Sequence, residues 1–237
     1  MLINDLTEYF NRSANYRGRY SGMDSPEYAT TREKWHSYPV QDFDYQFNSW
    51  GFRGPEYVEH MDKPVNICVG DSFTVNVGGP IEYSWASQLS NRFDIPTLNL
   101  GIDGASLEVL KLVYDRACKI FDVQNTFVMY TFFHRRLSED KRFIHIGCVD
   151  PDENIKYFEA NKIPNCTFTF LPIWCQMQDE MDYIYNNYSD NYYDLSQIPF
   201  EQATNRDGRH LSRDAHAIVA DFLWSKYSAS QLFDFNT

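Results

Sequence analysis

The pattern of hydrophobic positions changes at about residue 64. Residues 1–60 are polar and aromatic, contain turn-forming dipeptides and show no sustained hydrophobic period. A short apolar run rich in β-branched residues then occupies 65–69 and stops at Gly70, as a buried parallel strand does. We therefore expect an irregular N-terminal extension over residues 1–60 and a folded domain over residues 61–237.

Beyond this strand, short apolar runs alternate with longer amphipathic segments. Further strands are expected at 97–100, 126–133 and 166–174, and helices at 81–92, at 107–121 and from 213 to about 227. Ser212 is placed to cap the last helix. Alternation of this kind is typical of βαβ units, so the chain predicts a three-layer α/β/α sandwich with a mostly parallel sheet of about five strands.

The charge balance narrows the class of partner. The chain has 33 acidic and 21 basic residues, a net charge of −12, which repels a phosphate backbone and an anionic membrane surface. The first residues lack the basic start and apolar stretch of a secretory signal, and no apolar run approaches the roughly 20 residues of a membrane span. We expect a soluble, cytoplasmic chain that binds no nucleic acid. Its abundance of Asn, Asp, Tyr and Phe is typical of AT-rich genomes, and a viral source is one candidate.

The pattern of cysteines and the lack of glycine-rich phosphate-binding motifs argue against a metal or nucleotide cofactor. The five cysteines form an odd set without a CxxC pair, so neither a disulfide framework nor a zinc site is indicated. The phosphate-binding patterns G-x-x-x-x-G-K-[ST] and G-x-G-x-x-G are both missing. We therefore expect chemistry without a cofactor.

Two short strings carry candidate chemistry. Gly70-Asp71-Ser72 follows the first predicted strand, where parallel sheets place their sites, although the same residues also suit an ordinary turn. Asp207 and His210 precede the last helix, three positions apart, and can meet across one turn. A serine nucleophile needs such a base, and the base needs a carboxylate to orient it. Taken alone, the second string also suits a surface loop.

Together the two strings resemble the SGNH, or GDSL, hydrolase family, whose fold is flavodoxin-like. The resemblance implies Ser72 as nucleophile, with Asp207 and His210 completing a triad. The string NLGIDGAS at 99–106 is similar to the family's second block and implies the N–H groups of Ser72 and Gly101 as the oxyanion hole. For Gly104, the second glycine of that string, we expect only a role in a tight turn.

The third block of the family, GxND, is not matched. The corresponding stretch, at 131–137, reads TFFHRRL and has no asparagine. Arg135 aligns best with the missing residue and His134 next, and either side chain can donate a hydrogen bond to an oxyanion. Arg135 could instead bind an anionic group of the substrate or pair with a carboxylate. Asp71, Arg135 and His134 are the candidate substrate-binding residues.

The resemblance implies a serine esterase that works through an acyl-enzyme. The aromatic-rich loops favour a short-chain or O-acetyl ester of a carbohydrate, although for the tyrosines at 183–193 ordinary packing is favoured over a sugar-stacking surface. One alternative is a catalytically impaired module of the same fold that binds a glycan or a partner. Another is an unrelated α/β domain. The oligomeric state is not indicated, and the other histidines, such as His216, are expected to be structural or solvated.

Overall fold

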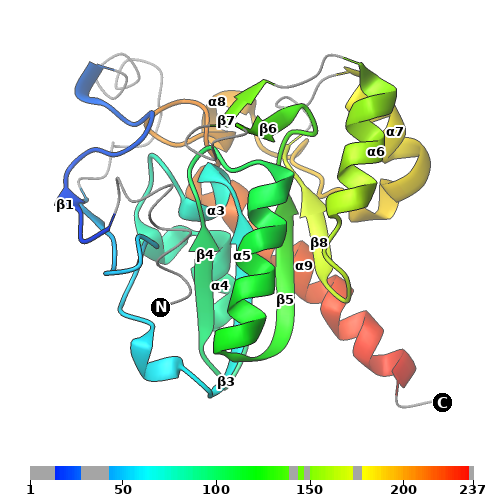
Figure 1. Cartoon of the computed structure of the whole chain (residues 1–237). Coiled ribbons are helices and arrows are strands. Elements are labelled where there is room, and N and C mark those ends of the chain that lie inside the picture. The colour runs from blue at the N-terminus through cyan, green and yellow to red at the C-terminus, as the bar shows by residue number, and fades with distance from the viewer. Residues whose placement is uncertain (1–13, 28–42, 139–143, 147–149, 173–177, 235–237) are drawn as a thin grey trace.

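The computed structural model describes residues 14–27, 43–138, 144–146, 150–172 and 178–234. Its centre is a sheet of four parallel strands in the order β4-β3-β5-β8 (Figure 1). The strands are β3 (Pro64–Gly70), β4 (Thr97–Gly101), β5 (Asp122–Tyr130) and β8 (Thr167–Phe170). The predicted α/β class with a mostly parallel sheet is confirmed, with four strands among the described residues against the roughly five expected.

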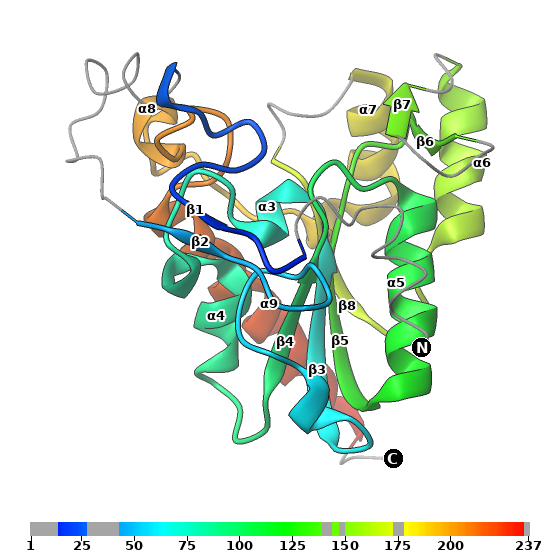
Figure 2. The ribbon, with the colours of Figure 1, turned by 60° about the vertical axis from the view of Figure 1, so that its left-hand side comes forward.

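Helices cover both faces of the sheet (Figure 2). One face packs against α5 (Leu107–Ile120), α6 (Pro151–Asn161) and α7 (Gln178–Tyr188), and the other against α4 (Trp85–Ser90) and α9 (Arg213–Asp234). Strand β3 shows why both faces are apolar, because Val65, Ile67 and Val69 enter the first cluster while Cys68 enters the second. A strand buried on both faces reads as a continuous apolar run, which is the pattern at 65–69.

Several predicted elements differ at their ends: the strand expected at 126–133, for example, is β5, which runs from Asp122 to Tyr130. The helix expected over 81–92 is divided into η3 (Ile81–Tyr83) and α4, because Ser84 lies between them and its Oγ accepts the N–H of Ser87 at 3.1 Å as an N-cap. The last helix begins as expected, with Ser212 Oγ accepting the N–H of Ala215 at 3.3 Å. It continues to Asp234, beyond the predicted end near 227.

The remaining elements are short. They are β1 (Arg17–Gly18), β2 (Tyr45–Gln46), η2 (Val58–His60), α3 (Ser72–Val75), β6 (Arg135–Leu137), β7 (Ile144–Ile146), η5 (Ser189–Asn191) and α8 (Phe200–Ala203). Strands β1 and β2 pair antiparallel, and their segment lies near α3 and α8 (Figure 2). The division at residue 60 stays a prediction, and Phe52 and Tyr57, from its N-terminal side, are part of the main hydrophobic core.

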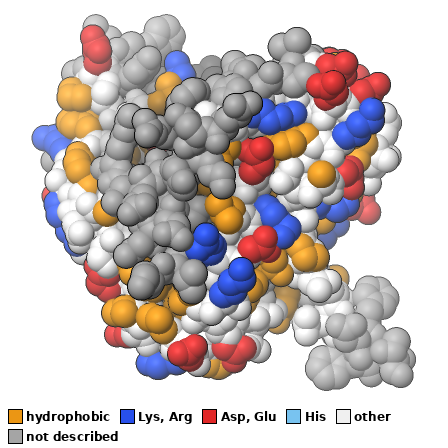
Figure 3. Space-filling model, in the orientation of Figure 1, with side chains coloured by type: hydrophobic (Ala, Val, Ile, Leu, Met, Phe, Trp, Pro, Cys, Tyr) orange, Lys and Arg blue, Asp and Glu red, His pale blue; other side chains and the backbone are white. Residues whose placement is uncertain are grey.

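The surface is mixed in charge. On the face shown in Figure 3, basic and acidic side chains are interspersed over the described part of the chain. None of the helices in the described segments combines the length and the apolar character needed to cross a bilayer.

Candidate active site

The first candidate string lies at the carboxyl edge of the sheet. Strands β3 and β4 end in register, with Gly70 opposite Gly101. Ser72 follows Gly70 by two positions and begins α3, so it stands where the chain leaves the sheet. This is the edge at which parallel sheets place their sites.

Helix α3 leaves the N–H of Ser72 without an acceptor. Asp71 caps the helix, since its Oδ1 accepts the N–H of Phe73 at 3.1 Å and its backbone oxygen accepts those of Thr74 and Val75 at 2.9 and 3.0 Å. Among the described residues, no group accepts the N–H of Ser72. The start of α3 therefore offers one unused backbone donor, on the candidate nucleophile itself.

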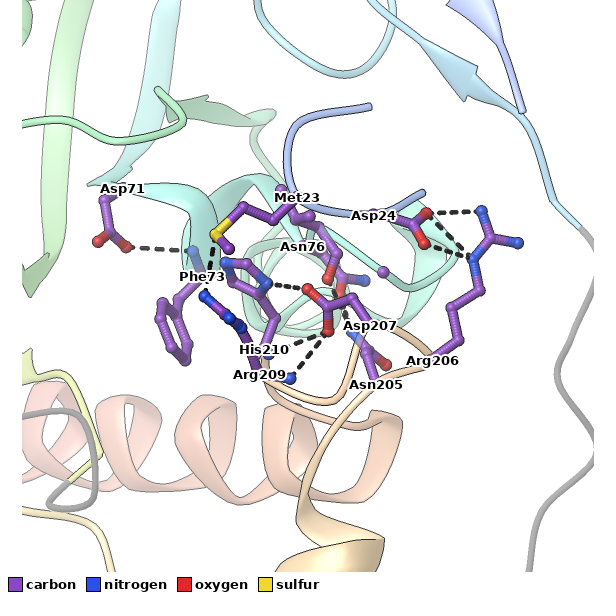
Figure 4. A network of polar contacts seen from close by, with 12 residues as sticks. Met23, Asp24, Asp71, Phe73, Asn76, Asn205, Arg206, Asp207, Arg209 and His210 are labelled. Carbon is purple, nitrogen blue, oxygen red and sulfur yellow. Dashed lines mark hydrogen bonds and ion pairs between the residues drawn. The ribbon is translucent and has the colours of Figure 1, made fainter. Parts of the chain in front are cut away.

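Asp207 and His210 form a buried hydrogen-bonded pair (Figure 4). Asp207 Oδ2 and His210 Nδ1 are in a very short contact, and Asp207 Oδ1 accepts the N–H groups of Arg209 and His210 at 3.1 and 3.2 Å. Burial alone would lower the pKa of His210, but the hydrogen bond and charge of Asp207 outweigh it and raise that pKa. Burial would likewise raise the pKa of Asp207, and the contacts with His210 reverse this and lower it. Asp207 therefore stabilises the protonated form of the imidazole relative to an isolated histidine, as a general base that takes up a proton requires.

The imidazole lies next to the start of α3. The ring of His210 packs against that of Phe73, with centroids 4.7 Å apart. Phe73 is adjacent to Ser72 in the chain, so the structure brings the two candidate strings together. No hydrogen bond joins Ser72 Oγ to His210 in this arrangement. Catalytic hydrogen bonds without substrate are often long and tighten when substrate binds.

A loop that the sequence does not single out holds Asp207 in place. Gly78, after α3, has φ +83°, and a Cβ there would lie 2.9 Å from Asp207 Oδ1. Its N–H donates to Tyr45 Oη at 2.7 Å. The backbone at residue 78 therefore packs directly on the carboxylate, a position that only glycine fills without strain.

His216 has a structural role, as expected. Its Nδ1 accepts the N–H of Trp85 at 3.2 Å, so its Nε2 donates to Asn76 Oδ1 at 2.9 Å. Burial lowers the pKa of His216 to about 3, which keeps this ring neutral. It ties α9 to the end of α3 and takes no part in proton transfer.

Arg135 and His134 are both committed to protein carboxylates. Arg135 Nη1 donates to Asp71 Oδ2 at 2.9 Å and also to Thr131 Oγ1 at 2.9 Å. His134 Nδ1 lies 3.2 Å from Glu180 Oε1 on α7. The contact of Arg135 with Asp71 agrees with the alternative that this arginine pairs with a carboxylate, and the replacement of the oxyanion asparagine by either side chain stays a prediction.

The Asp71 side chain is occupied by contacts within the protein. It is fully buried, and both of its carboxylate oxygens accept hydrogen bonds from the protein, Oδ1 from Phe73 and Oδ2 from Thr131 and Arg135. Asp71 thus caps α3 and anchors Arg135, contacts that leave neither oxygen exposed for the predicted role in substrate binding. The GDS string thus combines one capping residue with one candidate nucleophile.

The two glycines of the second block differ in how their N–H groups are used. The N–H of Gly101 donates to Asn99 Oδ1 at 3.0 Å, and a Cβ on Gly101 would lie 2.7 Å from the backbone nitrogen of Val75. Gly101 is therefore needed for close packing. Gly104 has φ +74°, no atom within 4 Å of the place a Cβ would take, and no acceptor for its N–H among the described residues. The backbone of Gly104 therefore leaves an N–H and open space beside it, at an Asp-Gly turn that the sequence indicates.

In the described segments, no three His, Cys, Asp or Glu side chains converge as metal ligands. No protein-family model and no curated protein sequence matches the chain.

Several solved structures are similar to the chain in fold. Esterase EstA from Pseudoalteromonas sp. is 12% identical over 72% of this chain and 99% of its own, with a TM-score of 0.43. A member of the lipolytic protein G-D-S-L family from Veillonella parvula is 11% identical over 70% of this chain and 98% of its own, at 0.44. The lipase/acylhydrolase from Enterococcus faecalis is 13% identical over 70% and 96%, at 0.42. Because these identities and TM-scores are low, the similarity concerns the fold alone. Any chemistry has to be argued from the residues of this chain.

Proposed function

We propose that the protein is a serine hydrolase that cleaves carboxylic esters, with Ser72 as nucleophile, His210 as general base and Asp207 as the residue that orients it. The buried Asp207–His210 pair is the observation that carries the proposal. Its imidazole packs against Phe73, beside the serine that begins α3. A serine, a histidine and a carboxylate in this relation are the parts that acyl transfer needs.

In the proposed mechanism Asp207 accepts the Nδ1–H of His210, which leaves Nε2 to take the proton of Ser72 Oγ. The serine oxygen then attacks the ester carbonyl, and His210 returns the proton to the departing alcohol. Water, activated by the same imidazole, hydrolyses the acyl-enzyme and restores Ser72. Asp207 keeps the ring in one tautomer and stabilises its charge while it holds the proton.

The oxyanion of the tetrahedral intermediate is stabilised by hydrogen-bond donors that have no acceptor before the substrate binds. The N–H of Ser72 and the N–H of Gly104 meet this description. Each preorganised donor of this kind contributes on the order of 10²–10³ in turnover. The proposal therefore replaces Gly101 by Gly104 and does not require an asparagine side chain.

For the substrate, we propose a short acyl ester such as an O-acetyl group on a carbohydrate. No organic cofactor or metal enters the mechanism.

The test is hydrolysis of p-nitrophenyl acetate, butyrate and octanoate by the wild type and by Ser72→Ala and His210→Ala. Ser225→Ala and His60→Ala are the matched controls, since Ser225 is exposed on α9 and His60 lies in η2. We expect turnover that falls at least about 10³-fold in the first two variants and is kept in the controls. Equal turnover in Ser72→Ala would contradict the proposal.

A second candidate is a binding module of the same fold. The missing hydrogen bond between Ser72 and His210 is the observation that favours it. It predicts no ester turnover and no reaction of Ser72 with a fluorophosphonate, although the protein is folded.

A further inference from the structure

Asp103 stands at the same edge of the sheet as Ser72. Gly70 and Gly101 are paired across β3 and β4, and Ser72 and Asp103 each follow by two positions. The N–H of Ile102 donates to the oxygen of Gly70 at 3.0 Å, which holds the two chain segments together past the end of the strands. Asp103 therefore leaves the sheet beside the candidate nucleophile.

The N-terminal segment reaches Asp103 from the other side. A Cβ on Gly22 would lie 2.3 Å from Asp103 Oδ2, so the backbone of Gly22 touches the carboxylate. The next residue, Met23, accepts a hydrogen bond through Sδ from Arg209 Nη1 at 3.6 Å. Arg209 precedes His210 in the chain, so this contact joins the segment of Gly22 to the loop that carries the imidazole (Figure 4). Asp103 thus lies between the Ser72 edge and the His210 loop.

In the part of the chain that the structure describes, no group donates a hydrogen bond to the Asp103 carboxylate. Asp71 and Asp207 each accept several hydrogen bonds, whereas no described residue donates one to Asp103. Water reaches the side chain, yet protein atoms around it raise its pKa by desolvation, against the lowering effect of the charge of His210. A carboxylate in such a place accepts hydrogen bonds from water in the free protein and can exchange that water for a hydroxyl of the substrate.

We propose that Asp103 determines substrate specificity by accepting a hydrogen bond from a hydroxyl on the alcohol portion of the ester. The inference rests on the proposed esterase function and names its substrate class, acyl esters of carbohydrates and other polyols. A hydroxyl supplies a donor in place of that water, whereas an ether or alkyl group desolvates the carboxylate without one. An anionic alcohol is repelled by the same charge.

The experiment compares two acetates that differ only in hydroxyls. One is a methyl mono-O-acetyl-β-xylopyranoside, and the other is the same acetate with its two remaining hydroxyls O-methylated. The ratio of their kcat/KM values is measured for the wild type, Asp103→Ala and Asp103→Asn. Asp94→Ala is the matched control, because Asp94 is also exposed but precedes β4 at its opposite end.

We expect the wild type and Asp94→Ala to prefer the hydroxylated acetate by about 10-fold or more, the value of a hydrogen bond to a charged group. The preference should fall to within about twofold of unity in Asp103→Ala. Asp103→Asn should lie between, since its amide oxygen accepts without a charge. An unchanged preference in Asp103→Ala, or no preference in the wild type, overturns the inference.

Failure of the esterase proposal is distinguishable. If no acetate is turned over in a Ser72-dependent way, that proposal fails. Calorimetry of the binding of the same two acetates to Ser72→Ala, with and without Asp103→Ala, then still tests whether Asp103 accepts a hydrogen bond from the hydroxyl. Selective binding of the hydroxylated acetate that requires Asp103 supports the inference, and equal binding of both overturns it.

Discussion

Asp24 forms a buried ion pair with Arg206, the residue immediately before Asp207. Asp24 Oδ2 lies 2.6 Å from Arg206 Nη2, and the two side chains are 0% and 4% exposed. Arg206 Nε donates to both carboxylate oxygens at 3.0 Å, and Tyr45 Oη donates to Oδ2 at 2.8 Å. The N-terminal segment is thereby fastened to the loop that carries the Asp207–His210 pair (Figure 4).

Removing one side chain of the Asp24–Arg206 pair should destabilise the folded protein. Asp24→Ala leaves the Arg206 guanidinium buried without its carboxylate, and we expect a loss of about 3–5 kcal/mol in the free energy of unfolding. Urea unfolding followed by tryptophan fluorescence measures it. Glu59→Ala, at a carboxylate that is 70% exposed, is the control and should change stability by less than about 1 kcal/mol. A loss no larger than that of the control would show that the pair does not hold the loop.

The pH dependence of turnover should report His210. The general base must be neutral, and Asp207 raises its pKa above the ordinary 6.5, so kcat/KM should rise with pH through a midpoint above that value. Asp207→Asn removes the charge and should lower both the imidazole pKa and, by about 10⁴-fold, kcat. NMR titration of the His210 ring measures the shift without activity, and His216, with a pKa of about 3, should not titrate nearby. A His210 pKa that stays the same in Asp207→Asn would refute the electrostatic role of the aspartate.

Gly78→Ala should damage both stability and activity. The new Cβ meets Asp207 at 2.9 Å at a φ of +83°, so left-handed strain of about 1–2 kcal/mol is joined by a steric clash. Gly104→Ala is the matched control for stability, because its φ is +74° but the space around it is open. Thermal unfolding of both should show the larger loss for Gly78→Ala. Equal losses would mean that the contact with Asp207 is unimportant.

The Arg135–Asp71 pair should prove structural. Arg135→Ala leaves a fully buried carboxylate without its cation, and we expect a loss of about 3 kcal/mol. Asp71→Asn in the same background should recover part of it, since the uncompensated charge is gone. If Arg135→Ala instead lowers kcat at full stability, Arg135 acts on the reaction and our assignment is wrong.

Much of the fold can be predicted from the sequence because its signals are local. The apolar run at 65–69 forms β3, and the amphipathic period at 107–121 forms α5, since a buried strand and a one-sided helix each leave a pattern within a few residues. The short spacing of Asp207 and His210 likewise indicates their contact.

The differences between sequence and structure lie where partners are far apart in the chain. Arg135 meets Asp71 across 64 positions, and Arg206 meets Asp24 across 182. No periodicity links such residues, so the sequence does not decide whether Arg135 is an oxyanion donor or the partner of a carboxylate, and it gives no sign of the role of Asp24. The sequence favours Gly101 over Gly104 for another reason, because it does not reveal that the side chain of Asn99, two residues away on the same strand, accepts the N–H of Gly101.

The central claim is that Ser72 is a nucleophile activated by His210. The most direct measurement is intact-mass and peptide mapping after reaction with a fluorophosphonate, on the wild type, Ser72→Ala and His210→Ala. We predict one adduct, on the peptide that contains Ser72, absent in Ser72→Ala and slowed by at least about 10²-fold in His210→Ala. An unlabelled wild-type protein, or labelling that survives in Ser72→Ala, would contradict the account.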